Sequence, residues 1–434
     1  MSTMESAKVR DGLAEEEQLE KGILERLRSE FGFIRGNFLV MVLSWLILDL
    51  ASEMPSTYYP KYVEALGGTA AIIGLIGAAE LVARAFVQIP GGYLADKYGR
   101  KWLIFTMTFL AGIARVFYVF APSWEWILVG AIMCGFAGIY QPALNAIIAD
   151  SVPKEKRGMG FSIIQLIAGA STTPAPLIAG YLYTKMGLVP SVRLSYIVVV
   201  ISFMAATALR SRLKETVEEP EKINLSEMLK SYPSSFRESI NVWKIVPRGA
   251  FILFLVFIAT NFTSGLFQPV FTLYILDDLG IDFLAFSYLM TTLFVSIILL
   301  ALPAGKIIDK VGKKRPLTAA FIIWGLAIPL FIWGDFYRLI AAMSLIGLIQ
   351  VLINGSAMAL TADLVPREHR GKVNGSRGFF TMIALSLGMF AGGWLYDNVG
   401  HQIPFLLQFV LIIPPILLVY FFIEEPKKAE INGA

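Results

Sequence analysis

Five ionisable residues lie inside apolar stretches of the first third of the sequence, where an unpaired charge is costly. They are Asp49, Glu53, Glu80, Arg84 and Arg115. Asp49 and Glu53 are four residues apart, as are Glu80 and Arg84, so each pair shares one face of a helix. Three acids against two bases leave one carboxyl group without a basic partner. A carboxyl group in an apolar setting binds a proton readily, so these residues predict proton-transfer chemistry.

The segments that carry these charges are long enough to cross a membrane. Of the 434 residues, 56% are hydrophobic and only 16% are charged, whereas soluble chains are about 25% charged. A bilayer core requires roughly 20 apolar residues per helix. Twelve such segments can be read, at 37–59, 69–95, 101–121, 126–149, 158–185, 190–209, 249–276, 281–308, 316–334, 339–362, 373–398 and 403–423. The sequence therefore predicts an all-α integral membrane protein with 12 transmembrane helices.

Helix geometry places the five charges in one layer of the membrane. At 1.5 Å per residue, all five fall roughly 18–24 Å from the same membrane face. We expect Glu80 and Arg84 to bond to each other, and Arg115 to meet Asp49 or Glu53. Asp49 and Glu53 are then the first candidates for carrying a proton. The alternative is a rigid salt-bridge cluster whose spare acid is hydrated.

A long polar gap divides the helices into six and six. The predicted organisation is a tail at 1–36, a six-helix bundle at 37–212, a linker at 213–247, a second bundle at 248–424 and a tail at 425–434. Residues 14–34 have apolar side chains at helical spacing, which predicts an amphipathic helix on the membrane surface, with a solvated tail as the alternative. With both termini in the cytoplasm, 31 of the 37 lysines and arginines lie on the cytoplasmic side. The basic excess thus reports orientation, and a nucleic-acid partner is not needed to explain it.

The two halves repeat at a fixed offset of 213 residues. This offset relates Gly92 to Gly305, Asp96 to Asp309, Gly99 to Gly312 and Asp150 to Asp363, among other pairs. Several loops agree without a gap, which chance explains poorly. Parallel repeats of this kind predict two pseudo-symmetric bundles with a cavity at their common axis, near the middle of the membrane.

The strongest local motif lies in the first of these loops. Gly92-Tyr-Leu-Ala-Asp96-Lys97-Tyr-Gly99-Arg100-Lys101 resembles G-x-L-x-D-(R/K)-x-G-R-(R/K), the loop between helices 2 and 3 of the major facilitator superfamily. A second copy contains Gly305, Asp309 and Gly312. With the helix count and the duplication, the resemblance covers nearly the whole chain. It implies a transporter that works by alternating access, in which this loop latches the two halves on the cytoplasmic side.

The resemblance also implies where the latch forms. Asp96 is expected to face the start of helix 11 around Arg377, and Asp309 to mirror it at the start of helix 5. Glycines in the loop allow a tight turn between closely packed helices. The alternative is a turn whose charges only set the orientation, which leaves the fixed aspartate and its duplication unexplained.

Helix 5 resembles a drug/proton antiporter, with one departure. Its Ser171-Thr-Thr-Pro-Ala175-Pro176-Leu-Ile-Ala179-Gly180 resembles G-x-x-x-G-P-x-x-G-G, with a small residue at each glycine position. Small residues let helix backbones approach closely. Many antiporters carry an arginine in helix 4, twelve residues before a proline, where this sequence has Gly130. This argues against proton coupling through that arginine.

By the same resemblance, helices 1, 4, 7 and 10 line the cavity. Their candidate substrate-binding residues are Trp45, Tyr140, Gln141, Asn145, Asn261, Phe267, Gln268, Gln350 and Asn354. Aromatic side chains with a few amides suit a lipophilic or amphipathic substrate.

The predicted function is a secondary transporter that exports small amphipathic compounds in exchange for protons. Uptake of a sugar, an organic acid or another nutrient is the alternative, and a non-transporting membrane sensor or assembly factor is the alternative of another class.

No Ser/His/Asp set or phosphate-binding loop is found, so we do not expect an enzyme. One cysteine, Cys134, and two histidines argue against a metal site. We expect no cofactor, a small-molecule substrate, protons and the lipid bilayer as partners, a monomer, and a multi-pass location in the plasma membrane.

Overall fold

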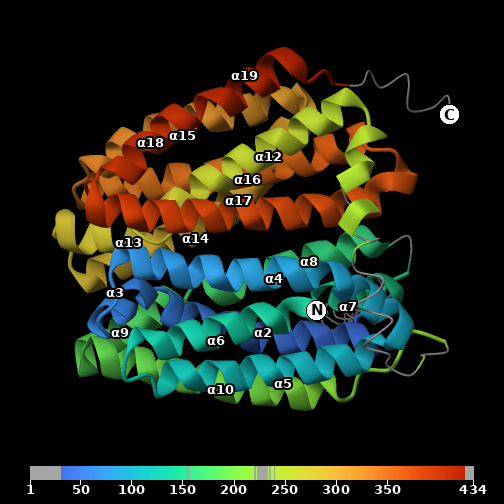
Figure 1. Ribbon diagram of the computed structural model, residues 1–434, viewed down its shortest axis with the longest axis horizontal. Coiled ribbons are helices and arrows are strands. Elements are labelled where there is room, and N and C mark those ends of the chain that lie inside the picture. The colour runs from blue at the N-terminus through green and yellow to red at the C-terminus, as the bar shows by residue number, and fades with distance from the viewer. Residues whose placement is uncertain are drawn as a thin grey trace, which may run out of the picture.

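The computed structural model describes residues 31–153, 156–218, 221, 233, 236–238 and 240–425. These residues form two bundles of helices that run along the long axis of the molecule (Figure 1), one from each half of the chain. The amphipathic helix predicted at 14–34 falls almost entirely outside the described residues.

The first bundle is built from the N-terminal half, with short connections between its helices. In chain order its elements are α2 (Gly36–Ser56), α3 (Tyr59–Ala65), α4 (Ala70–Tyr98), α5 (Arg100–Val119), α6 (Trp124–Ala137), η1 (Gly138–Tyr140), α7 (Gln141–Ser151), α8 (Arg157–Thr172), α9 (Ala175–Met186) and α10 (Leu188–Arg210). The segments of the bundle follow the predicted spans to within a few residues, because their apolar runs end at charged or glycine-containing turns.

The second bundle follows the segment after α10. Its elements are η3 (Val242–Lys244), α12 (Arg248–Phe267), α13 (Phe271–Leu273), the π-helix η4 (Tyr274–Asp278), α14 (Phe283–Val311), α15 (Lys314–Ile332), α16 (Phe336–Leu364), η5 (Arg367–His369), α17 (Arg370–Asn398), α18 (Ile403–Leu411) and α19 (Ile413–Phe422).

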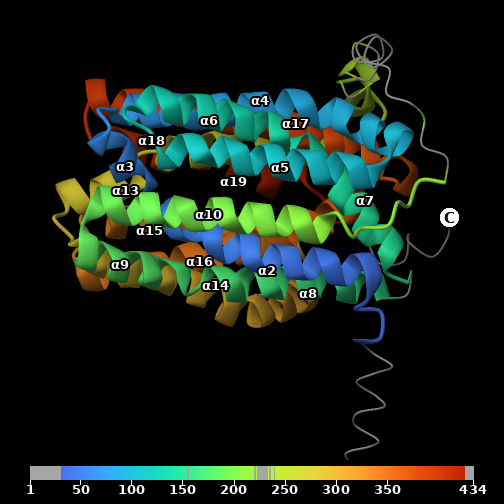
Figure 2. The same cartoon turned by 90° about the horizontal axis from the view of Figure 1, so that it is seen from below.

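Within the described residues, eleven helical segments are long and apolar enough to cross a membrane. The predicted fifth span is the one that does not qualify as a single helix. It folds as α8 and α9, which are separated at Thr173 and Pro174 because proline lacks the N–H that a continuous helix needs there. Figure 2 shows α8 and α9 following one another along one line, and both pack against α14.

Two glycine turns define one end of the molecule, called here the motif end. Gly99 joins α4 to α5 with φ 98°, and Gly312 joins α14 to α15 with φ 94°. Positive φ is strained for other residues, so both turns require glycine. The motif end lies to the right in Figure 1, beside α7, and the opposite end carries α3 and α13. The prediction of two equivalent tight turns is confirmed.

The two bundles meet chiefly where α4 packs along α17 and where α8 and α9 pack along α14. The helices of the first pair almost touch at their backbones. A Cβ atom on Gly74 would lie 2.2 Å from the carbonyl oxygen of Met389, and one on Gly393 would lie 2.2 Å from that of Ala70. Gly180 of α9 instead faces a side chain of α14, because a Cβ atom there would lie 2.5 Å from the hydroxyl oxygen of Ser287. Glycines of the second and eleventh predicted spans therefore bring backbones together across the boundary between the halves, and Gly180 of the fifth span makes room for the Ser287 side chain.

Candidate functional site

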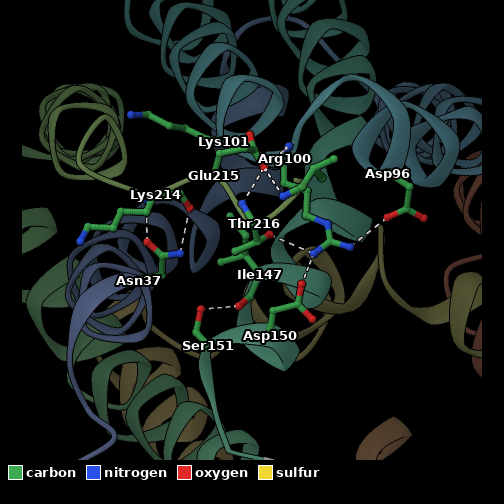
Figure 3. Close-up of polar contacts among 11 residues, drawn as sticks. Asn37, Asp96, Arg100, Lys101, Ile147, Asp150, Ser151, Lys214, Glu215 and Thr216 are labelled. Carbon is green, nitrogen blue, oxygen red and sulfur yellow. Dashed lines mark hydrogen bonds and ion pairs between the residues drawn. The ribbon is translucent and has the colours of Figure 1, made fainter. Parts of the chain in front are cut away.

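The turn at Gly99 is fixed by an acidic residue from beyond the first bundle. The carboxylate of Glu215 accepts hydrogen bonds from the backbone N–H groups of Arg100 and Lys101, both at 3.0 Å (Figure 3). These N–H groups begin α5 and have no partner within the helix, and the helix dipole favours an anion there. Burial alone would raise the pKa of Glu215, but its backbone hydrogen bonds outweigh burial and lower the pKa.

The side chain of Arg100 joins three segments at the motif end (Figure 3). It forms ion pairs with Asp150 at the end of α7 and with Asp96 at the end of α4, the latter at 3.0 Å. It also donates to the hydroxyl of Thr216 at 3.0 Å. Arg100 therefore ties the motif loop to α7 and to the segment that follows α10.

The second bundle repeats this arrangement. Glu425 accepts hydrogen bonds from the backbone N–H groups of Lys313 and Lys314, which begin α15 after the Gly312 turn. Lys313 forms an ion pair with Asp363 at the end of α16. The offset of 213 residues relates Arg100 to Lys313 and Asp150 to Asp363, so the same ion pair occurs in both halves.

The two capping glutamates were missed by sequence reasoning. Adding 213 to Glu215 gives Lys428 rather than Glu425, so the repeat does not relate the two acids. A usable signal existed, since each is among the first acidic residues after the last predicted helix of its half.

The expected latch between Asp96 and Arg377 is not formed. Asp96 is exposed and pairs with Arg100 of its own half. Arg377 donates to the hydroxyl of Thr361 at 3.2 Å and lies 4.5 Å from the ring centre of Phe257. The mirrored contact of Asp309 would fall at the start of α8, where several side chains lie outside the described part of the chain.

At the opposite end, by contrast, the two halves are bonded together. Lys61 donates to both carboxylate oxygens of Asp277, at 2.8 and 3.1 Å. The hydroxyl of Tyr58 donates to the carbonyl oxygen of Phe283 at 2.6 Å. Asp397 accepts from the N–H groups that begin α4, including that of Ala71 at 2.7 Å. Among the described residues, the two halves are therefore bonded together at the opposite end, whereas the Asp96–Arg377 contact expected at the motif end is absent.

The intramembrane charges only partly follow the predicted pairing. Arg84 donates to Glu80 at 2.7 Å, as predicted. The prediction that Arg115 meets Asp49 or Glu53 is wrong. Arg115 lies 5.0 Å from the ring centre of Tyr118 and within electrostatic range of Glu80. Helical spacing fixes contacts within a helix, whereas the rotation of α5 against its neighbours decides which way Arg115 points.

Asp49 and Glu53 remain free of basic ion-pair partners within the described residues. Glu53 accepts a hydrogen bond from the hydroxyl of Ser56 at 2.8 Å. Asp49 lies within electrostatic range of Arg210 without forming an ion pair with it. In the described part of the chain, two carboxyl groups thus lack an ion-pair partner, where the sequence predicts one such group.

Arg210 is a buried cation that lies one residue beyond the predicted sixth span, 190–209. Its side chain is fully buried, donates to the hydroxyls of Thr108 at 2.7 Å and Ser44 at 3.2 Å, and lies 5.6 Å from the ring centre of Tyr140. One terminal nitrogen has no hydrogen-bond partner within the described residues. The signal for burial was periodicity, because Arg210 continues the buried face of α10 formed by Val199, Phe203 and Ala206.

Two cavities open near the middle of the molecule. One, of about 580 Å³, lies between the halves, and its walls include Glu53, Glu80 and Arg115 on one side and Phe267, Gln268 and Gln350 on the other. The second, of about 500 Å³, lies within the second bundle. Its walls include all five candidate residues of the C-terminal half, namely Asn261, Phe267, Gln268, Gln350 and Asn354.

The candidates of the N-terminal half are placed differently. Trp45, Tyr140, Gln141 and Asn145 line neither of these two cavities. Tyr140 is buried beside Arg210, and Trp45 packs against the apolar cluster near the motif end. The sequence predicts these side chains in the cavity because helices 1 and 4 are expected to form the cavity wall. In the structure, α2 and the η1–α7 segment turn these side chains away from both cavities.

Two helical bundles packed around an interdomain cavity, with duplicated charged turns at one end, define a multi-pass membrane transporter. The chain belongs to the Major Facilitator Superfamily, whose sequence model matches residues 41–268 and 253–434. Membership confirms the resemblance of the motif loop and places the chain among transporters rather than enzymes.

Curated relatives align over most of the chain. An uncharacterized MFS-type transporter of Methanocaldococcus jannaschii is 26% identical over 355 residues, which cover 78% of this chain and 86% of the relative. The multidrug resistance protein MdtG of Escherichia fergusonii is 23% identical over 407 residues, covering 92% of this chain and 97% of the relative.

Solved structures share the fold at lower identity. The human organic anion transporter MFSD10 matches with a TM-score of 0.65 and 16% identity, over 88% of this chain and 98% of that one. A POT family transporter in complex with 5-aminolevulinic acid matches with a TM-score of 0.70 and 12% identity, over 88% and 95% of the two chains.

Proposed function

We propose that this chain exports small amphipathic compounds in exchange for protons by alternating access. The observation that carries the proposal is the cavity between the halves. Carboxyl groups of Glu53 and Glu80 line the same space as the aromatic ring of Phe267 and the amide of Gln268. Proton-binding groups and an amphipathic surface thus face one compartment, so occupancy by substrate and by proton can influence each other.

The two walls of this cavity differ in charge, which supports proton binding by the N-terminal half rather than by the C-terminal half. The charged residues that line this cavity all come from the N-terminal half, and the wall from the C-terminal half is neutral. Asp49 and Glu53 are the proposed proton carriers, because neither forms an ion pair with a base among the described residues. A carboxyl group in low dielectric takes up a proton when it loses compensation and releases it when a cation or water approaches.

The arrangement of the two ends supports alternating access. We place the motif end in the cytoplasm, since the lysines and arginines gather there. The bonds at the opposite end then close the external side, and the unlatched motif end corresponds to the state that loads substrate from the cytoplasm. The close backbone contact of α4 with α17 suits rocking of one bundle against the other. The MdtG relatives are named multidrug resistance proteins, which agrees with export of amphipathic compounds.

The proposal is tested in proteoliposomes with an imposed pH gradient and a panel of cationic, neutral and anionic amphipathic compounds. Wild-type protein is expected to drive uphill movement of at least one class. Asp49→Asn or Glu53→Gln is expected to abolish pH-driven movement while leaving exchange at equal pH intact. Glu125→Gln, which alters a fully exposed acid of α6, is the matched control. Unchanged pH-driven movement in both variants would overturn the assignment.

A further inference from the structure

The cavity inside the second bundle has one charged wall residue, and it is basic. Its walls are formed by α12, α15, α16, α17 and α18, all from the C-terminal half. Arg377 is the sole charged residue among the residues that line it. A volume of about 500 Å³ lies within the range of roughly 300–1,000 Å³ that is common for sites of small organic ligands.

Arg377 has no acidic partner among the described residues. Its hydrogen bond goes to the neutral hydroxyl of Thr361, and its other close neighbour is the ring of Phe257. A guanidinium carries five N–H donors, so one hydroxyl satisfies only a fraction of them. A half-buried arginine that lacks an acidic partner among the described residues can bind an anion that enters the cavity.

The rest of the wall is organised along two facing helices. On α12, residues Thr260, Asn261, Ser264 and Gln268 recur at helical spacing, and on α16, Gln350 and Asn354 do the same. The hydroxyl of Thr260 is buried and has no partner within the described residues. At 1.5 Å per residue, the polar face of α12 extends about 16 Å from the level of Phe257 to Gln268. The aromatic side chains of Phe267, Trp324 and Phe331 cover the adjoining wall.

The charges of the two cavities are opposite in character. The cavity between the halves is lined by Glu53, whose negative charge has no basic ion-pair partner among the described residues, by Glu80, which is paired with Arg84, and by Arg115. A negatively charged headgroup is therefore drawn away from the N-terminal half and toward Arg377. The two cavities share Phe267, Gln268, Ile346 and Gln350 as wall residues, so they lie side by side.

We infer that the cavity inside the second bundle is an anion subsite, in which Arg377 binds the acidic headgroup of an amphipathic organic anion. The guanidinium supplies paired, charge-assisted hydrogen bonds to a carboxylate or sulfonate. The amides of α12 and α16 bind further polar groups, and the aromatic wall holds the apolar body. This inference deepens the proposed function, on which it rests, by naming the substrate class.

The test compares three probes with one apolar body and different charges: 1-naphthalenesulfonate, 1-naphthalenemethanol and 1-naphthylmethylammonium. Binding to the full-length protein in phosphatidylcholine nanodiscs is measured by calorimetry. Wild-type protein is expected to bind the sulfonate about tenfold or more tightly than the other two. Arg377→Gln is expected to remove that preference, and Arg377→Lys to retain part of it. Arg338→Gln, which alters an exposed arginine at the opposite end, is the matched control.

Equal binding of all three probes by the wild type, or an undiminished preference in Arg377→Gln, would overturn the inference. Loss of sulfonate binding when phosphatidylglycerol is added to the nanodiscs would assign the site to a lipid headgroup and overturn it as well. If a variant does not fold, the order in which the wild-type protein binds the three probes still tests the anion subsite. Failure of pH-driven transport with the preference intact would count against the proposed function and leave the anion subsite standing.

Discussion

Lys61 of α3 donates hydrogen bonds to both carboxylate oxygens of Asp277, and so bonds the two halves of the chain together at the end opposite the motif loops. The Lys61 side chain is only 14% exposed, whereas that of Asp277 is 42% exposed. A partly exposed ion pair contributes little free energy by itself, on the order of 0.2–1 kcal/mol. That is still enough to bias an equilibrium between two nearly balanced states.

Asp277→Asn is therefore expected to populate a state that is open at this end. A reporter Ser287→Cys, buried between α9 and α14, should react with a maleimide about two- to fivefold faster in this background. Asp335→Asn is the control, because Asp335 pairs with Arg338 of its own half. The pair has no gating role if both backgrounds label at the same rate.

Glu215 makes a pH-dependent contribution to stability through the start of α5. Its pKa is lowered in the folded protein, so the stabilisation is present above the ordinary carboxyl pKa and is lost as pH falls through the folded value. Capping residues contribute about 0.5–2 kcal/mol. Thermal unfolding in detergent between neutral and acidic pH should show a smaller loss of stability on acidification for Glu215→Gln than for wild type. The exposed neighbour Glu218→Gln should behave like wild type.

Backbone contact between α4 and α17 predicts a strong difference between two glycines of one helix. Gly393→Ala places a Cβ 2.2 Å from the carbonyl oxygen of Ala70, whereas Gly375→Ala meets nothing within 4 Å. Overpacking costs about 1–3 kcal/mol, so Gly393→Ala should lower the melting temperature and the transport rate. Gly375→Ala should leave both unchanged or slightly improved. Equal effects of the two substitutions would contradict close packing at this boundary.

Arg210 is the fixed positive charge nearest to Asp49 on which the coupling account depends. A carboxyl group that loses a nearby cation holds its proton to higher pH. Arg210→Gln should therefore move the midpoint of pH-dependent transport upward by about half to one pH unit. Arg212→Gln, an exposed change two residues later, should not. An unchanged midpoint in Arg210→Gln would show that this charge does not act on the group that couples transport to protons.

Local spacing predicted the parts of this structure that a single helix or turn determines. The four-residue separation of Glu80 and Arg84 gave their ion pair, and the duplicated loop gave the turns at Gly99 and Gly312. The partner of Arg115 could not be predicted, because it depends on how α5 is rotated against its neighbours.

Two further differences have equally local causes. Arg210 falls one residue beyond the predicted sixth span, although the periodicity of α10 places it on the buried face. The predicted fifth span reads as continuously apolar, yet Pro174 divides it into α8 and α9.

The central claim, that substrate moves against protons, is tested most directly by measuring proton movement itself. Proteoliposomes that contain a trapped pH-sensitive dye are given a substrate gradient at equal internal and external pH. The account predicts that downhill movement of substrate drives protons across the membrane in the opposite direction, and that Asp49→Asn or Glu53→Gln abolishes this proton movement. Substrate movement without any proton movement, or with protons moving in the same direction, would contradict it.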